Sequence, residues 1–190
     1  KGGLNQIDLT VVGKRGGEFI ESQLATAASD PELVAATVNE IVELGEDRKS
    51  WLIFSSGIKH ARMLLEEFES HGISVDAVTG EDSKKVRDQT IADFKSGKLR
   101  CLINVNVLTT GFDHPAVDLI GLIRATASTG LYVQMVGRGT RIADGKENCL
   151  VCDFGANVER HGFIDKVNPN YKTSSGDGEA PVKTCEKCQT

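Results

Sequence analysis

From residue 30 onward, short apolar segments alternate with segments of helical period, and this alternation constrains the fold more than any other feature. Continuous apolar runs such as 51–54 are typical of strands that are covered on both faces. The pattern predicts strands over 51–54, 73–78, 99–105, 117–123 and 148–154, and helices over 31–45, 58–71, 84–96 and 129–141. Repeated strand–helix order predicts an α/β fold, a parallel sheet with helices on both faces. Ligands of such sheets bind at the carboxyl ends of the strands.

The two ends of the chain do not follow the alternation. Residues 7–12 predict a strand, 13–17 a glycine-rich turn, and 18–28 a helix. We therefore expect residues 1–29 to be a lead-in from a domain upstream, and residues 30–155 to form the sheet domain. Residues 156–190 are rich in Asn, Ser, Gly and Lys, so they predict an irregular tail that begins as a linker.

Composition narrows the classes of function. The chain is 39% hydrophobic, which suffices for a packed core, and it has no apolar run of the about 18 residues that a membrane span needs. Its 22 basic and 27 acidic residues give a net charge of −5, which excludes a generally basic nucleic-acid coat. Two windows are nevertheless basic, 84–100 and 124–146. They suggest a focused site for an anion, although charge alone equally fits solvated surface cations.

The cysteines indicate a reducing compartment. There are five, an odd number, and Cys101, Cys149 and Cys152 lie in apolar, strand-like runs. Buried thiols rather than a disulfide framework are therefore expected, and with them a cytoplasmic location.

Cys185 and Cys188 form a polar Cys-x-x-Cys pair, which is half of a four-ligand zinc site. We expect the tail to be the start of a truncated zinc ribbon whose other pair would follow Thr190. Cys149 and Cys152 have the same spacing, but in a strand they would point to opposite faces, so they are expected to be core thiols. The histidines lack ligand spacing and are expected at the surface or at helix ends: His60, His71, His114 and His161.

The segment 129–141 carries the strongest local signal. Gln134, Arg138 and Arg141 are spaced by four and three, so on a helix they would share one face. Two guanidinium groups and an amide suit a polyphosphate. Gly137 and Gly139 cost a helix about 1 kcal/mol each relative to Ala, which close approach of a ligand or another backbone would explain. A surface helix with two solvated arginines remains the alternative.

The loop after the strand over 99–105 adds to this signal. Thr109 and Thr110 offer hydroxyls, and Gly111 allows the backbone to present its N–H to an anion. Asp113 offers a carboxylate that can accept from a ribose hydroxyl. An ordinary turn that Asp113 fixes and Pro115 ends is the alternative interpretation.

These segments resemble the second RecA-like domain of superfamily-two helicases. The matching motifs, in order, are 51–55, 78–80, 104–113 and 134–141. The most specific part is Gln-x-x-Gly-Arg-x-x-Arg following a Thr-Gly-x-Asp loop, and the resemblance covers about residues 31–155. The segment 104–113 and the cysteine-containing tail are most similar to RadD-type DNA-repair helicases, with type I and III restriction motor subunits close behind.

The resemblance implies roles for individual residues. Arg141 would be the arginine finger and Arg138 would lie beside it, both facing ATP held by a partner RecA-like domain. Gly111, Asp113 and Gln134 would line the same nucleotide cleft. Contacts to the nucleic-acid backbone would come from Ser55, Thr79, Gly80, Thr109 and Thr110.

What the sequence lacks shapes the functional prediction. It contains no Gly-x-x-x-x-Gly-Lys-Ser/Thr loop and no apolar strand that ends in Asp-Glu. ATP and magnesium are therefore expected to be bound mainly by the upstream RecA-like domain, and this chain alone is expected not to hydrolyse ATP. The resemblance thus predicts the C-terminal motor half of an ATP-dependent helicase or translocase that acts on single-stranded or branched DNA.

Other functions stay open. They are an RNA helicase, a motor domain of a restriction enzyme, and a nucleic-acid-binding module without catalysis. A Rossmann-type oxidoreductase is disfavoured, because no Gly-x-Gly-x-x-Gly follows a strand.

Overall fold

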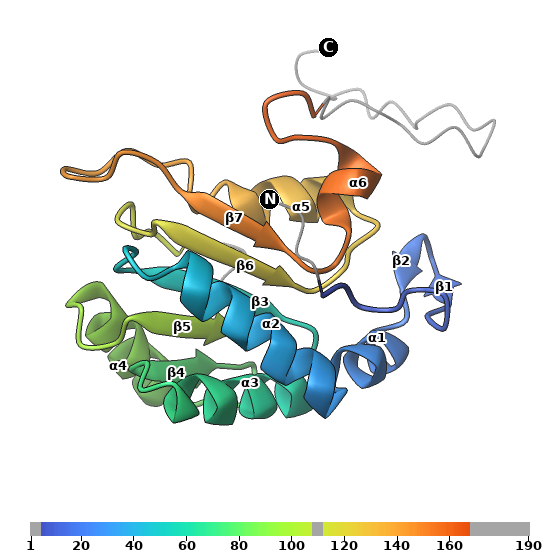
Figure 1. The fold of residues 1–190 in the computed structure, drawn as a ribbon, viewed down its shortest axis with the longest axis horizontal. Coiled ribbons are helices and arrows are strands. Elements are labelled where there is room, and N and C mark those ends of the chain that lie inside the picture. The colour runs from blue at the N-terminus through green and yellow to red at the C-terminus, as the bar shows by residue number, and fades with distance from the viewer. Residues whose placement is uncertain (1–4, 108–111, 168–190) are drawn as a thin grey trace, which may run out of the picture.

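A computed structural model of the chain describes residues 5–107 and 112–167 (Figure 1). Its centre is a five-stranded sheet in the order β4-β5-β3-β6-β7, and every neighbouring pair is parallel. The strands are β3 (Trp51–Ser55), β4 (Val75–Val78), β5 (Cys101–Asn104), β6 (Leu119–Ile123) and β7 (Leu150–Asp153). The predicted parallel α/β sheet is confirmed.

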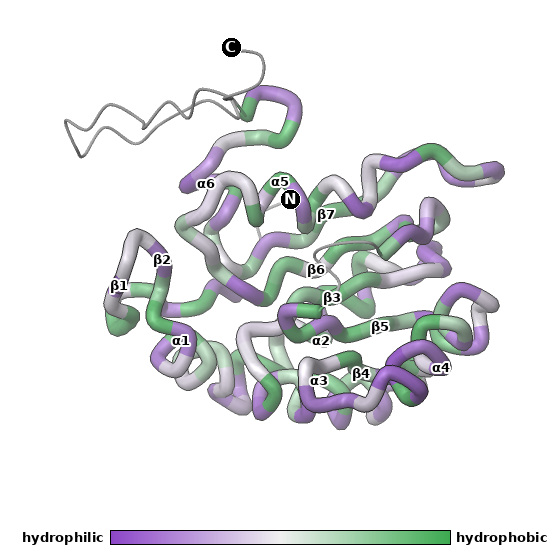
Figure 2. The backbone as a smooth tube through the Cα atoms, turned by 180° about the vertical axis from the view of Figure 1, so that it is seen from behind, coloured by the Kyte–Doolittle hydropathy of each residue, from purple (hydrophilic) through white to green (hydrophobic). Residues whose placement is uncertain are grey.

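Helices cover both faces of this sheet because alternate strand residues point to opposite sides. Trp51 and Ile53 pack into the core under α1 (Glu21–Ala28), α2 (Pro31–Leu44) and α3 (Ile58–Ser70). Leu52 and Phe54 pack into the second core, under α4 (Lys84–Lys95) and α5 (Thr129–Val136). The short α6 (Asn157–His161) lies beside α5. In Figure 2, hydrophobic colour accordingly concentrates along the central strands.

Helix starts follow the residues that predicted them. The Asp30 carboxylate accepts a hydrogen bond from Leu33 N at 2.9 Å, with Pro31 in the first turn of α2. Ser83 caps α4 in the same way, accepting from Val86 N at 3.3 Å. These caps satisfy N–H groups that have no partner within the helix, and so they fix where each helix begins.

The N-terminal segment differs from its prediction. Residues 7–12 are not a strand; Ile7 N instead donates to the Phe154 carbonyl at 2.9 Å, a single contact beside the sheet. The glycine-rich turn is present, and it joins the antiparallel pair β1 (Lys14–Arg15) and β2 (Glu18–Phe19). The following helix therefore begins at Glu21 rather than at residue 18.

The α5 helix ends at Val136, five residues before its predicted end. The hydrogen bonds change just after Val136. Arg138 N donates to the Met135 carbonyl at 3.3 Å and Gly139 N to the Val136 carbonyl at 2.9 Å, three residues back rather than the four of an α-helix. Gly137 and Gly139 also have poor helix propensity. Arg138 and Arg141 thus lie in turns beyond the helix, and the prediction that they share a helix face with Gln134 is wrong.

The packed body includes parts of both predicted flanks. Leu24 and Ala28 of α1 are buried in the first core. Asn157 is fully buried, and its Nδ2 donates to the Arg124 carbonyl at 2.8 Å. No helix in the described part of the chain is long and apolar enough to cross a membrane. Cys185 and Cys188 lie outside the described residues.

A glycine after β7 tests how tightly this body is packed. A Cβ on Gly155 would lie 2.7 Å from the Arg124 carbonyl oxygen and 2.8 Å from Ala125 N, which are backbone atoms with little room to move. We expect Gly155→Ala to lower the free energy of unfolding by about 1–3 kcal/mol in urea titrations. Gly80→Ala is the control, because a Cβ on Gly80 would have nothing within 4 Å of it. Equal stability of the two variants would contradict the packing described.

Candidate functional site

Arg138 and Arg141 converge on one backbone oxygen, the carbonyl of Phe112. Arg138 Nη1 donates to it at 2.6 Å and Arg141 Nη1 at 3.3 Å, and Arg141 also forms an ion pair with the Asp113 carboxylate. Burial lowers the pKa of Arg138, and the neighbouring Arg141 charge lowers it further. Arg138 is 9% exposed, whereas the side chains of Arg141 and Asp113 are 37% and 69% exposed. Arg141 and Asp113 are therefore the members of this cluster that face solvent.

Lys146 fixes the loops that carry this cluster. Its ammonium donates to Pro115 O at 2.9 Å and to the Gly139 and Arg141 carbonyls at 2.8 Å. Burial lowers its pKa. In the sequence Lys146 is one of the cations of the basic window 124–146, and no local pattern shows that three carbonyl groups from two loops would meet it.

The glycine at position 139 is explained by the fold itself. A Cβ on Gly139 would collide with Cys149 Sγ and lie 2.9 Å from Ile120 Cδ1. The close approach expected at Gly139 is thus made by a neighbouring side chain of this chain. Gln134 lies on α5 and is exposed.

The arginine cluster lies away from the carboxyl ends of the strands. Because α5 carries the chain back from the end of β6 toward the start of β7, its C-terminal end lies toward the amino ends of the strands. The predicted site residues are therefore divided between two places. The arginines, Asp113 and Gln134 belong to the face around α5, whereas Ser55, Thr79 and Gly80 belong to the carboxyl edge of the sheet.

At that edge, Thr79 and Gly80 form a tight turn after β4. Thr79 N donates to the Asp82 carboxylate at 2.6 Å, and Thr79 Oγ1 accepts from Glu81 N at 3.2 Å. Gly80 is exposed. Thr109, Thr110 and Gly111 lie outside the described residues.

Ser55 is buried, and its hydroxyl donates to the Gly57 carbonyl at 3.1 Å. The adjacent His60 is fully buried, so an expected place at the surface is wrong, but it does lie at a helix end, in the first turn of α3. Its Nδ1 accepts from Ser56 N at 3.2 Å, and burial lowers its pKa to about 4. The neutral ring therefore holds the turn between β3 and α3.

A groove of about 400 Å³ opens at the same edge. It lies between α1, the first residues of α3 and the segments that follow β4 and β5. Glu21, Gly57, Gly80 and Asn106 are among the residues that line it.

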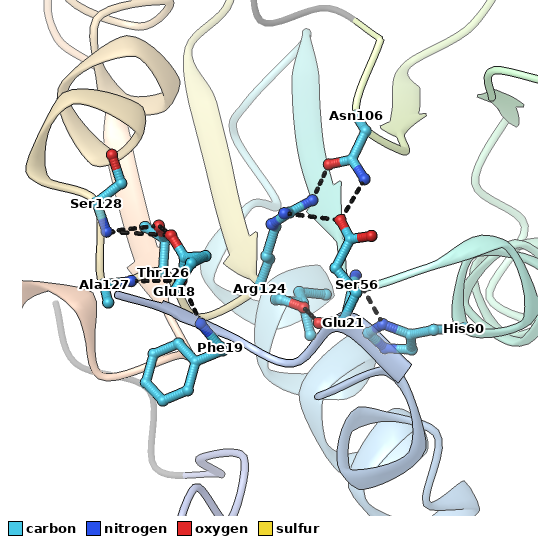
Figure 3. Close-up of polar contacts among 11 residues, drawn as sticks. Glu18, Phe19, Glu21, Ser56, His60, Asn106, Arg124, Thr126, Ala127 and Ser128 are labelled. Carbon is cyan, nitrogen blue, oxygen red and sulfur yellow. Dashed lines mark hydrogen bonds and ion pairs between the residues drawn. The ribbon is translucent and has the colours of Figure 1, made fainter. Parts of the chain in front are cut away.

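Two carboxylates from the N-terminal segment reach this edge, and sequence reasoning missed both (Figure 3). Glu18 accepts from Thr126 Oγ1 at 2.6 Å, Ala127 N at 2.7 Å and Ser128 N at 3.2 Å. Burial on its own raises the pKa of Glu18, but these hydrogen bonds outweigh it and leave the pKa below its ordinary value.

Glu21 makes the second contact, with side chains that follow β5 and β6. Its Oε1 accepts from Asn106 Nδ2 at 2.9 Å and lies 3.3 Å from Arg124 Nη2. Arg124 Nη1 also donates to Asn106 Oδ1. The strand-end positions of Asn106 and Arg124 were a usable signal for a site.

Much of the charge in the two basic windows is used inside the protein. Arg100 stacks on Trp51 and donates to the Gly45 and Glu46 carbonyls at 2.8 Å, which completes the C-terminal end of α2. Arg124, Arg138 and Lys146 make the contacts given above. Lys84 and Lys85 line an open surface depression on α4. The basic windows 84–100 and 124–146 therefore reflect hydrogen bonds within the protein as much as a site for an anion.

Among the described residues, Cys101, Cys149 and Cys152 form no disulfide, and Cys101 and Cys152 are buried. Cys149 and Cys152 pack into the two cores on opposite faces of the sheet, as their strand spacing predicted. Within residues 5–107 and 112–167, no group of three or more His, Cys, Asp or Glu side chains could hold a metal ion.

The parallel sheet, its helices and the contact between the segments 104–113 and 134–141 define a C-terminal RecA-like domain of a superfamily-two helicase. Residues 33–143 match the family described as Helicase conserved C-terminal domain, and the chain belongs to this family. It is 31% identical to IRC3 of Saccharomyces cerevisiae over 151 residues, which is 78% of this chain and 22% of IRC3. The chain thus spans about a fifth of that relative.

Two solved structures show the same fold with ligands bound. One is Dbp5 of S. cerevisiae bound to RNA and ADP BeF3, with 26% identity and a TM-score of 0.55 over 64% of this chain and 32% of that chain. The other is the helicase Lhr of Mycobacterium smegmatis bound to ssDNA and AMP-PNP, with 25% identity and a TM-score of 0.57 over 72% of this chain and 20% of that chain.

The buried His60 predicts how stability depends on pH. The folded ring titrates at about 4, whereas in the unfolded chain it titrates near 6.5, so the unfolded state takes up the proton first. The contribution of His60 to the free energy of unfolding should be constant above about pH 7 and should fall toward pH 4, by at most about 1.4 kcal/mol per pH unit. His60→Asn keeps an acceptor for Ser56 N but does not titrate, so urea titrations of this variant should show a shallower fall. Identical slopes would show that His60 does not cause the dependence.

Proposed function

We propose that this chain is the C-terminal motor half of an ATP-dependent DNA helicase or translocase. It would act with an ATP-binding RecA-like domain of the same protein. The observation that supports this most directly is the convergence of Arg138 and Arg141 on Phe112, which leaves the Arg141 guanidinium at the surface beside Asp113. Family membership supports the coarser part, a helicase domain that works with ATP.

In this proposal Arg141 is the arginine finger. A guanidinium stabilises the negative charge that develops on the phosphoryl group during transfer, and it does so best when it is already in position. Arg138 is a positioning residue. Its hydrogen bond fixes the Phe112 carbonyl, to which Arg141 also donates. Asp113 restrains Arg141 until the nucleotide arrives, and its carboxylate can then accept from a ribose hydroxyl.

The donor set fits a nucleotide that another domain holds. Arg141 and Gln134 offer exposed N–H donors for phosphate oxygens, and Gly111, which lies outside the described residues, is assigned to the same cleft. ATP, when bound between the two domains, would close them on itself and supply the phosphoryl group that is transferred to water. Magnesium is assigned to the upstream domain.

The nucleic acid is assigned to the carboxyl edge of the sheet. Thr79 and Gly80, together with Thr109 and Thr110 outside the described residues, are the proposed contacts to its backbone. Ser55 is assigned a positioning role instead, because its buried hydroxyl already donates to Gly57.

We favour single-stranded or branched DNA because of the resemblance to RadD-type repair helicases. An RNA helicase is the second candidate, since Dbp5 is seen bound to RNA. Binding of this chain to matched DNA and RNA strands would decide between them. A role in DNA repair, zinc at Cys185 and Cys188, and a cytoplasmic location stay predictions from the sequence, as does the division of the chain at residues 29 and 155.

The first consequence concerns the chain on its own. Its sequence has no phosphate-binding loop, so we expect no ATP turnover above buffer in a phosphate-release assay, with or without single-stranded DNA. DNA-stimulated release by the purified 190-residue chain would contradict the division of labour between two domains.

The second consequence concerns Arg141 in a longer protein that includes the upstream domain. Arg141→Ala should lower DNA-stimulated ATP hydrolysis by roughly 10³-fold, while DNA affinity stays largely unchanged. Arg15→Ala is a matched control, because Arg15 is an exposed cation in β1 far along the chain from this cluster. Turnover that survives Arg141→Ala would favour a passive binding module.

A further inference from the structure

The N-terminal arm, residues 5–29, folds back across the carboxyl edge of the sheet and places two carboxylates there. Glu18 and Glu21 differ in how they are held. Glu18 accepts three hydrogen bonds from the segment 126–128 that leads into α5. Glu21 contacts only side chains, those of Asn106 and Arg124, and its own side chain is 65% exposed. Solvent and salt reach the Glu21 side of this ion pair, so Glu21 is the more easily displaced of the two carboxylates.

Arg124 is arranged as an anion receptor. It is 9% exposed, and both of its terminal nitrogens point to Asn106 and Glu21. Its buried Nε has no hydrogen-bond partner among the described residues. A guanidinium with a donor to spare, next to an amide N–H, is the donor set that binds a phosphate as well as a carboxylate.

Asn106 completes this receptor in a backbone conformation that few residues adopt. Its φ is 58°, in the left-handed region, which is uncommon for residues other than glycine. This conformation places the Asn106 amide between Arg124 and Glu21 (Figure 3). Backbone strain of this kind often accompanies binding sites.

The groove beside the receptor has the wrong charge while Glu21 is in place. Asn106 lines both the groove of about 400 Å³ and the narrow cavity against Arg124. Among the described residues that line the groove, Glu21 is the sole ionisable side chain. A nucleic-acid strand would therefore meet a negative charge there, and withdrawal of Glu21 would expose a positive one instead.

We propose that Arg124 and Asn106 bind a backbone phosphate of the nucleic-acid strand, and that Glu21 occupies this position when no strand is bound. The inference rests on the proposed function, since it places the strand in this groove. Glu18 keeps the arm attached while Glu21 turns away. The arm thus acts as an intramolecular competitor that a strand must displace.

The test is nucleic-acid binding by the 190-residue chain at low salt, measured by fluorescence anisotropy with labelled single-stranded DNA and RNA of equal length and sequence. Glu21→Gln should bind both strands about 5- to 10-fold more tightly than the unaltered chain, because it removes the competing charge. Glu69→Gln is the matched control: it changes the net charge equally, and Glu69 is exposed near the C-terminal end of α3, at the opposite end of that helix from the groove. It should change affinity less than twofold.

A second substitution tests whether the gain passes through Arg124. In the Glu21→Gln background, Arg124→Gln should abolish the gain, and Arg124→Lys should retain part of it. Circular dichroism melts of each variant establish that it is folded before binding is compared.

The outcomes separate the two proposals. Equal affinities of Glu21→Gln and Glu69→Gln would overturn the competitor role and leave nucleic-acid binding intact. A gain restricted to DNA or to RNA would contradict a contact to phosphate. Absence of binding by every protein would overturn both this inference and the proposed function.

Discussion

The carbonyl oxygen of Phe112 accepts hydrogen bonds from both motif arginines, and the proposed nucleotide face depends on that shared acceptor. The oxygen is fixed because the rest of the residue is fixed. The Phe112 ring is buried in the second core, stacked with Phe94 at 6.3 Å between centroids, with Lys95 above it at 5.7 Å. Packing of the Phe112 ring against α4 thus fixes the position of the carbonyl to which the Arg141 guanidinium donates. Preorganisation of this kind lets a charged group act without first rearranging.

One segment of the chain connects the two proposed surfaces. After β5, Asn106 takes part in the receptor at the strand ends, and Phe112 and Asp113 take part in the arginine cluster. Only six positions separate Asn106 from Phe112 along the sequence. The proposed strand contact and the arginine cluster therefore belong to one connection, the chain between β5 and β6.

The fold was predictable because its signals are local. Apolar runs predicted all five strands of the main sheet, and Asp30 and Ser83 predicted helix starts that the structure confirms. The errors arose where individual contacts rather than a repeating pattern decide the outcome. The α5 helix ends where N–H groups begin to donate three residues back, and the buried His60 ring accepts from Ser56 N ahead of α3. Neither contact leaves a periodic trace in the sequence.

The site was predictable only in part, for a related reason. Motif spacing identified Arg138, Arg141 and Asp113, and the structure brings these three residues together. Motif spacing could not identify Glu21, whose partner Arg124 is 103 positions away in the sequence. An acidic residue near a helix start is usually explained by the helix dipole, and that local explanation conceals any other use. Glu18 and Glu21 lie in the arm three residues apart, yet hydrogen bonds from backbone N–H groups help to hold the first, whereas side chains alone hold the second. The difference between an anchor and a displaceable contact therefore comes from the partners that the fold supplies, and a carboxylate in the sequence acquires either role only when the sheet edge has formed.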